Sequence, residues 1–388
     1  MISSSKKAAL ELNRKRADEL ADFSDLSEAS PSDILNSLTS EQDLATCAPD
    51  GECRTDPRTG LRILYSEKRA KRPHDNRPDK PDPGKKPQKE CPVCKGKTTR
   101  IIDMHPLSQG FTFINKNLFP ILYPGTVSGE QINFLENPPA QPDPVSAYGM
   151  HFLQWPSNRH DLDFENMPVQ DSCIVLERLA LLENKILHSE IPELRTTSGY
   201  EDPPHTGFSG IIKNYGHLVG GSLSHGHIQI AFTNIMPGVI RDNIRFRNSR
   251  NETFIHYLSR ENPDSLTLEE RDHFTAAVPY FMKRPLQTII YYHGNESYLH
   301  HISKEYLPDL AVLLKKNIGS LLSLMQRIGR EPAYNIIFHS GPGCEFYIEI
   351  LPYTQETGGY EHLGLFVCQG SPRSTADMYT QQGDFQSG

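Results

Sequence analysis

Residues 220–230 read Gly220-Gly221-Ser222-Leu223-Ser224-His225-Gly226-His227-Ile228-Gln229-Ile230. The alternation of polar and apolar residues predicts a β-strand, in which successive side chains point to opposite faces of a sheet. Ile228 and Ile230 would enter a core, while His225, His227 and Gln229 would lie side by side on the other face. A neutral imidazole is nucleophilic near pH 7 and an amide can donate to a phosphoryl oxygen, so this pattern suits attack on phosphorus. A metal site and plain packing are the alternatives.

Length, composition and charge narrow the function classes. The chain has 388 residues, of which 37% are hydrophobic and 23% charged. These values fit two domains or one large two-lobed domain. The formal net charge of -8 argues against general nucleic-acid binding. A local basic pocket remains compatible with that charge, so small phosphorylated ligands stay open as partners.

Cysteine usage and the N-terminus predict a cytoplasmic protein. The seven cysteines are an odd number, and only Cys91 and Cys94 are closely spaced, which does not suggest a disulfide framework. We therefore expect a reducing compartment. No stretch approaches the apolar length that spans a bilayer, and the charges in residues 1–7 are followed by no apolar signal core, so no membrane association is expected.

Charge divides the N-terminal part of the chain. Residues 1–50 carry ten acidic and five basic side chains, and we expect them to form a mobile extension. Residues 51–90 carry twelve basic and seven acidic side chains and end in a Pro/Lys-rich run, which predicts a linker or a phosphate-facing segment. From Cys91 onward the pattern is globular, with an N-terminal half expected over residues 91–245 and a C-terminal half over residues 246–388.

The periodicity of the globular part predicts an α+β fold. Two long helices are expected at residues 172–189 and 304–328. Strands are expected at residues 100–104, 112–114, 148–155, 207–213, 286–293, 334–340 and 345–351, besides the His-x-His strand. The order strand, helix, strand, strand occurs twice, which suggests a duplicated unit.

Five motifs follow one another along the chain. They are Asp56-Pro57-Arg58-Thr59-Gly60 with Ser66 and Arg69-Ala70-Lys71-Arg72-Pro73, then Cys91-Pro92-Val93-Cys94, Asn115-Lys116-Asn117-Leu118-Phe119-Pro120, Lys213-Asn214-Tyr215-Gly216 and the His-x-His strand. In this order they resemble the galactose-1-phosphate uridylyltransferase branch of the histidine-triad (HIT) superfamily, which also holds ADP-glucose and diadenosine tetraphosphate phosphorylases. The resemblance runs from about Arg54 to about Tyr379 and implies two HIT-like halves, each an antiparallel sheet with packed helices.

Cys91 and Cys94 form a possible metal knuckle. Their spacing lets two thiolates share one tetrahedral Zn(II), and a metal-free turn is the alternative. The resemblance supplies the two other ligands, His225 and the His160 of Pro156-Ser157-Asn158-Arg159-His160. The zinc would be structural, because four protein ligands leave no open position.

The resemblance implies that His227 is the nucleophile and that Gln229 holds a phosphoryl oxygen. The corresponding histidine of the related transferases attacks the α-phosphorus of a nucleoside diphosphate sugar, releases the sugar 1-phosphate and holds the nucleotide as a phosphoramidate. A second phosphate then takes the nucleotide. We therefore expect ping-pong kinetics.

Further residues are candidates for substrate contacts. Ser222 and Ser224 lie in the Gly-rich approach to the histidines and are equally at home in a turn. Asn115 and Asn214 match nucleotide contacts of relatives, with an Asn-capped turn as the alternative. Four arginines of residues 51–90 would bind phosphate or, alternatively, belong to a solvated loop: Arg54, Arg58, Arg69 and Arg72.

The C-terminal half departs from the family pattern. Glu345 and Tyr347 stand where the family usually has two histidines, and some relatives use these for a second metal, so a second site is doubtful here. Glu361, in Gly359-Tyr360-Glu361, matches a carboxylate that contacts hexose hydroxyls. A lysine often found shortly before it is absent, with Gln355 nearest, so the sugar pocket is expected to differ.

The sequence predicts a nucleotidyltransferase that passes a nucleotide from UDP-glucose to a hexose 1-phosphate such as galactose 1-phosphate. Residues 224–229 are nearer to the ADP-glucose phosphorylase pattern than to the uridylyltransferase pattern, so base and acceptor stay open. The alternatives are a phosphorylase of a nucleotide sugar or dinucleoside polyphosphate, and a zinc-stabilised nucleotide-binding protein without turnover. Relatives pair through their sheets, so the resemblance implies a homodimer.

Overall fold

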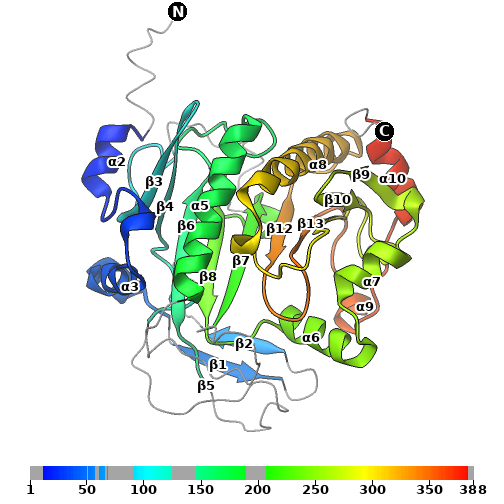
Figure 1. The fold of residues 1–388 in the computed structure, drawn as a ribbon, viewed down its shortest axis with the longest axis horizontal. Coiled ribbons are helices and arrows are strands. Elements are labelled where there is room, and N and C mark those ends of the chain that lie inside the picture. The colour runs from blue at the N-terminus through cyan, green and yellow to red at the C-terminus, as the bar shows by residue number, and fades with distance from the viewer. Residues whose placement is uncertain are drawn as a thin grey trace, which may run out of the picture.

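The computed structural model describes residues 12–49, 51–56, 61–65, 68, 91–124, 145–188 and 207–382. Within these residues, ten strands form one antiparallel sheet that extends through the molecule (Figure 1). In spatial order they are β3 (Ile101–Leu107), β4 (Gly110–Lys116), β6 (Gly149–Trp155), β8 (Ile228–Thr233), β7 (Phe208–Tyr215), β12 (Tyr334–His339), β13 (Tyr347–Pro352), β11 (Thr288–Tyr292), β10 (Phe274–Ala277) and β9 (Thr267–Glu270).

The two halves of this sheet have the same strand order. From the outer edge inward, the first half runs β3-β4-β6-β8-β7 and the second runs β9-β10-β11-β13-β12. In each half a long helix follows the third of these strands and leads to the innermost one: α5 (Val169–Leu187) connects β6 to β7, and α8 (Leu307–Arg327) connects β11 to β12. The halves meet where β7 pairs antiparallel with β12. The α+β prediction is confirmed, and the repeated order agrees with a duplication, which itself stays a prediction.

Helices α5 and α8 cover one face of the sheet and form the main core with it. Both carry leucines at helical spacing, such as Leu176 and Leu179 in α5 and Leu310 in α8, and these side chains are fully buried. Ile228 and Ile230 of β8 enter this core, as their alternation predicted. Gln229 therefore points to the opposite face.

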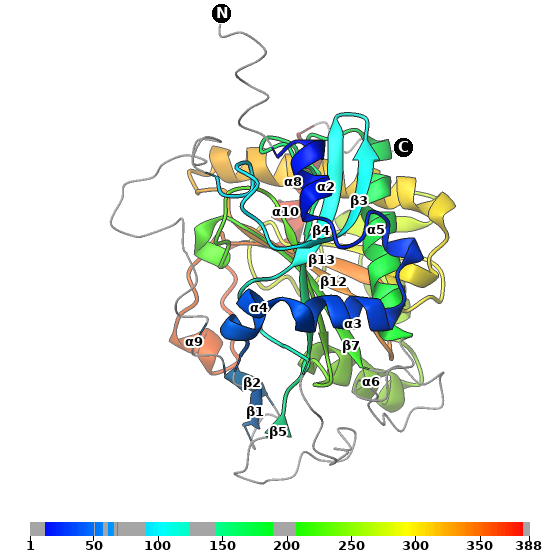
Figure 2. The same ribbon diagram turned by 90° about the vertical axis from the view of Figure 1, so that its left-hand side faces the viewer.

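Residues 12–49 are packed against the globular part, so the prediction of a mobile extension over residues 1–50 is corrected for this segment, whereas residues 1–11 and 50 lie outside the described residues. Figure 2 shows their helices beside the edge formed by β3 and β4. Leu26, Ile34 and Leu38 are buried in the main core. Acidic residues dominate the segment and hide this sparse apolar pattern. The helices are α2 (Arg14–Leu20), η2 (Leu26–Glu28), α3 (Pro31–Ser40) and α4 (Gln42–Cys47).

Charged side chains fix this N-terminal layer to α5. Arg178 of α5 donates from Nε to Asp103 (2.8 Å) and from Nη2 to Asp25 (2.7 Å). Asp103 is fully buried and also accepts from the backbone N–H of Leu26 (2.9 Å). A buried carboxylate with a guanidinium and a backbone donor is satisfied, so the layer has a defined position.

Most of the remaining elements lie around the second half of the large sheet or, in the view of Figure 1, below it. A small antiparallel sheet consists of β1 (Glu52–Thr55), β2 (Arg62–Tyr65) and β5 (Val145–Ser146). The four-residue strands β9 and β10 were not predicted, and the expected boundary between residues 245 and 246 falls inside α6. The other elements are α6 (Gly238–Arg250), α7 (Phe254–Glu261), α9 (Gly359–His362), α10 (Pro372–Thr380), η6 (His217–Val219), η7 (Asp264–Leu266), η8 (Leu299–His301) and η9 (Lys304–Tyr306).

Within the described ranges, none of the helices combines the length and apolar character needed to cross a bilayer.

Candidate functional site

The two histidines lie just before strand β8, which begins only at Ile228. The prediction that His225, His227 and Gln229 share one strand face is therefore wrong for the histidines. The chain is diverted at Gly226, where a Cβ atom would clash with Asp163. Asp163 forms a buried ion pair with Lys213 of β7 (2.6 Å), and the backbone passes directly against that pair.

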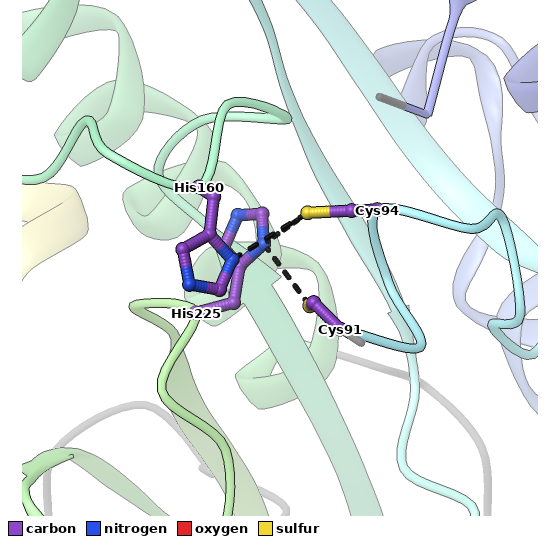
Figure 3. Close-up of side chains that lie close together, drawn as sticks. All are labelled: Cys91, Cys94, His160 and His225. Atoms are coloured by element: carbon purple, nitrogen blue, oxygen red, sulfur yellow. Dashed lines mark hydrogen bonds between the residues drawn. The ribbon is translucent and has the colours of Figure 1, made fainter. Parts of the chain in front are cut away.

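Cys91, Cys94, His160 and His225 converge in one buried cluster (Figure 3). Cys94 Sγ lies 3.5 Å from the Nδ1 atoms of both histidines, and Cys91 Sγ lies 3.7 Å from His225 Nδ1. Zinc bonds of about 2.3 Å to sulfur and about 2.0 Å to nitrogen place tetrahedral ligands roughly 3.6 Å apart. The four side chains therefore fit a single tetrahedral ion.

The protonation pattern of the cluster also suits a metal. His225 Nε2 lies 2.9 Å from the carbonyl oxygen of Ser157, which only accepts, so Nε2 carries the proton and the Nδ1 lone pair faces the sulfur atoms. The pKa of Cys91 is lowered to about 2, first by its hydrogen bond with Cys94 and, against the effect of burial, by those with His160 and His225. Thiolate and neutral imidazole are the forms that bind zinc.

Three segments far apart in the sequence build this cluster. The cysteines occupy a turn over residues 91–96 that ends in the left-handed Gly96. His160 follows the end of β6, and His225 precedes β8. Trp155, the last residue of β6, contacts the His225 ring at 5.3 Å between centroids. The cluster therefore ties the turn before β3 and the loop after β6 to the segment that carries His227.

His227 is buried and its imidazole is oriented by the backbone. Its Nδ1 lies 2.9 Å from the carbonyl oxygen of His225, so Nδ1 carries the proton and Nε2 carries the lone pair. Burial lowers the pKa of His227 to about 4. Trp155 packs against the ring, with centroids 4.9 Å apart. The result is a neutral imidazole, fixed in one tautomer, that can attack through Nε2.

Gln229 and Asn214 lie on the sheet face that α5 and α8 leave free. Lys213 is paired with Ile228, the first residue of β8, so Asn214 follows on β7 at the end of the sheet from which His227 leads into β8. Asn335 of β12 donates to Asn214 Oδ1 (2.7 Å) and to Val219 O (3.2 Å). Asn335 was not predicted as a site residue, although it lies in the strand expected at residues 334–340.

Asn115 fixes the aromatic ring that packs against His227. Its amide donates to the hydroxyl groups of Thr98 (2.6 Å) and Thr99 (2.7 Å), and its carbonyl accepts from Trp155 Nε1 (2.7 Å). Asn115 is 3% exposed. These bonds engage the Asn115 amide with partners inside the protein, and they fix the Trp155 ring that packs against His227. Direct contact of Asn115 with a nucleotide stays a prediction.

The other predicted substrate contacts are scattered. Ser222 is buried, and Ser224 Oγ lies 3.5 Å from His160 Nε2, at the metal cluster. Glu361 lies in α9, where its carboxylate accepts from the N–H groups of Gly358 and Val367. Arg54 is in β1, where it pairs with Glu52. Arg58, Arg69 and Arg72 lie outside the described residues.

A second metal site does not form around Glu345 and Tyr347 in the described part of the chain. Glu345 accepts from the hydroxyl of Thr253 (2.8 Å). Tyr347 is buried and stacks on His339 at 4.1 Å between centroids. His339 in turn donates to Glu349 (2.8 Å), so it already has a carboxylate partner.

Comparisons with known proteins support the resemblance and the fold. The chain is 23% identical over 337 residues to the ADP-glucose phosphorylase of Arabidopsis thaliana, which covers 80% of this chain and 86% of the relative. A solved uridylyltransferase matches with a TM-score of 0.64 at 19% identity, over 86% of this chain and 100% of that chain. An ADP-glucose phosphorylase from Arabidopsis thaliana, solved with bound ADP-glucose, matches with a TM-score of 0.59 at 19% identity, over 84% of this chain and 98% of that chain.

No family model matches the chain. The predicted resemblance to the uridylyltransferase branch, with ADP-glucose phosphorylase features, is confirmed by these relatives, as is the α+β fold.

Proposed function

We propose that this chain is a nucleotidyltransferase that carries a nucleoside monophosphate on His227. The observation that carries the proposal is the hydrogen bond from His227 Nδ1 to the carbonyl oxygen of His225, which commits one ring nitrogen as a donor and leaves the lone pair on the other, Nε2, as the nucleophile. A uridylyltransferase and an ADP-glucose phosphorylase among the similar proteins support transfer of a nucleotide. The neighbour solved with ADP-glucose supports a nucleotide sugar as donor.

The reaction has two balanced displacements at the same phosphorus. His227 Nε2 attacks the α-phosphorus of the nucleotide sugar, the bond to the bridging oxygen breaks, and the sugar 1-phosphate leaves. A phosphate oxygen of the acceptor then attacks the same phosphorus, and the P–N bond breaks to restore the imidazole. We assign Gln229 to a phosphoryl oxygen, because an amide donor there stabilises the developing negative charge. Burial of His227 protects the adduct from water.

We assign Cys91, Cys94, His160 and His225 to a structural Zn(II), in keeping with their donor atoms and separations. The ion would supply a rigid cross-link between the knuckle and the approach to β8. His225 belongs to the cluster through its ring and orients His227 through its carbonyl oxygen, so this one residue links the two functions.

Two acceptors are candidates. Transfer from UDP-glucose to galactose 1-phosphate is the specific reaction predicted from the sequence. Phosphorolysis, in which inorganic phosphate is the acceptor, is favoured by two observations: the similarity to an ADP-glucose phosphorylase and the reading of residues 224–229 as Ser-His-Gly-His-Ile-Gln.

Assays of each of two donors with each of two acceptors test this function. The protein is incubated with UDP-glucose or ADP-glucose, each with inorganic phosphate or galactose 1-phosphate, and the nucleotide products are separated by chromatography. Phosphorolysis is expected to release UDP or ADP, whereas hexose 1-phosphate as acceptor is expected to give the corresponding nucleotide galactose. Tight binding of a donor without product from any pair would instead support the zinc-stabilised binding protein. The homodimer also stays a proposal, which light scattering would test.

Gly226→Ala is expected to lower kcat by about 10²-fold, because the new Cβ clashes with Asp163 and displaces the flanking histidines. The matched control is Gly319→Ala in α8, where a Cβ would meet no atom within 4 Å, so kcat should not change. Steady-state kinetics with the best donor measure both variants. A Gly226→Ala enzyme with wild-type kcat would contradict the account of the turn.

A further inference from the structure

A second group of histidines lies apart from His227. His188 is the C-cap residue of α5, while His300 and His301 end the short helix η8. One ring nitrogen from each lies within 4.8 Å of the others. The ring centroids of His300 and His301 are 4.3 Å apart, and those of His188 and His300 are 5.1 Å apart.

This group lies over the helix-covered face of the sheet. The residue beneath it, Glu183 of α5, accepts from Ser209 of β7 (3.0 Å), and Ser209 is paired with Phe232, whose side chain enters the main core. Gln229 points to the other face. The histidine group is therefore a separate feature of the molecule from the proposed catalytic site.

A buried carboxylate fixes His300. Glu183 is fully buried, and its Oε2 accepts from His300 Nδ1 (2.8 Å) and from the His300 backbone N–H (3.0 Å). Its Oε1 accepts from the hydroxyls of Ser209 (3.0 Å) and Ser340 (2.5 Å). Every oxygen of this carboxylate is thus used, and the proton of His300 sits on Nδ1.

The other ring nitrogen of His300, Nε2, is left unsatisfied among the described residues. The side chain is 3% exposed, and Nε2 is buried with no hydrogen-bond partner among the described residues. A buried lone pair without a partner is costly, and such groups call for an explanation. A metal ion explains it directly, because histidines that bind metals usually donate their other N–H to a carboxylate.

We propose that His188, His300 and His301 bind a divalent transition-metal ion of the zinc, cobalt or nickel class. Imidazole nitrogens are good ligands for these ions. His188 Nδ1 lies 3.2 Å from the carbonyl oxygen of Asn184, so its proton sits on Nδ1 and its lone pair on Nε2. Three protein ligands leave a fourth position open to water or a small ligand. The ion would join the end of α5 in the first half of the sheet to η8 in the second.

Metal counting on the full chain, purified without a polyhistidine tag, tests this proposal. Apo protein is titrated with zinc chloride, dialysed and analysed by mass spectrometry of the bound metal. The wild type should hold two zinc ions per chain, and His301→Ala should hold one, with at least a tenfold weaker second binding step. His301 is the residue to change first, because it is exposed and its loss leaves the Glu183–His300 bond in place.

Cobalt(II) assigns each ion to its site. Only the cysteine cluster has thiolate ligands, so its cobalt complex alone shows thiolate-to-metal charge transfer. His301→Ala should keep that band and lose one cobalt ion, whereas Cys94→Ser should lose the band and keep one ion. The matched control is His217→Ala, an exposed histidine of η6 that pairs with Glu331 and should leave two ions bound. A wild type in which every bound cobalt ion gives the thiolate band, or a folded His301→Ala protein that binds as many ions as the wild type, would overturn the proposal.

Discussion

His227→Ala is expected to lower the rate of nucleotidyl transfer by at least about 10⁴-fold, because the variant has no atom to form the covalent intermediate. Gln229 and the rest of the sheet face remain, so the donor should still bind with a similar dissociation constant. Single-turnover release of the sugar 1-phosphate measures the lost step, and calorimetric titration of the donor measures binding.

The matched control for this variant is His217→Ala. His217 lies in the same approach to β8, but its side chain is 41% exposed and its partner is the half-exposed Glu331. The control should retain wild-type kcat, since exposed ion pairs contribute little. Circular dichroism verifies that both variants fold. Turnover by His227→Ala within tenfold of the wild type would remove His227 from the mechanism.

Cys94→Ser is expected to abolish zinc binding at the cysteine cluster and to lower both stability and activity. Cys94 Sγ contacts both cluster histidines, so its loss removes the most central ligand. A ligand present at 1,000 times its dissociation constant stabilises the native state by about 4 kcal/mol, and this contribution would be lost. Because His225 orients His227, we also expect kcat to fall by roughly 10²-fold.

Cys173→Ser is the matched control for the zinc prediction. Cys173 is a half-buried residue of α5 whose pKa is raised to about 11 by burial, so it is a protonated thiol outside any metal cluster. This variant should keep its zinc, melting temperature and kcat. Metal analysis, thermal unfolding and steady-state kinetics make the comparison. Unchanged zinc content in Cys94→Ser would contradict the ligand assignment.

The long periodic segments made the centre of the fold predictable. The helices α5 and α8 and the strands around them follow the spacing of their leucines and isoleucines, and Ile228 and Ile230 point where their alternation places them. Strands β9 and β10 have four residues each and were not identified from the sequence pattern. The helices of residues 12–49 were missed because Leu26, Ile34 and Leu38 are few among many acidic residues.

The candidate site was predictable where its residues are close neighbours in the sequence. Cys91 and Cys94 are neighbours in the chain, but His160 was reached only through the family resemblance, since no local spacing joins it to the cysteines. The turn at Gly226 depends on Asp163 and Lys213, two residues that only the fold brings to it. For the same reason, the contact between Glu183 and His300 could not be read from the sequence.

The central claim is that a nucleotide is bound covalently to His227, and intact-protein mass spectrometry tests it most directly. Wild type and His227→Ala are incubated with UDP-glucose or ADP-glucose without an acceptor and quenched at alkaline pH, where a phosphoramidate survives. The account predicts that the wild type gains the mass of one nucleoside monophosphate, which identifies the base, and that His227→Ala gains nothing. An adduct of equal yield on both proteins, or a wild type that turns over either donor without any adduct, would contradict it.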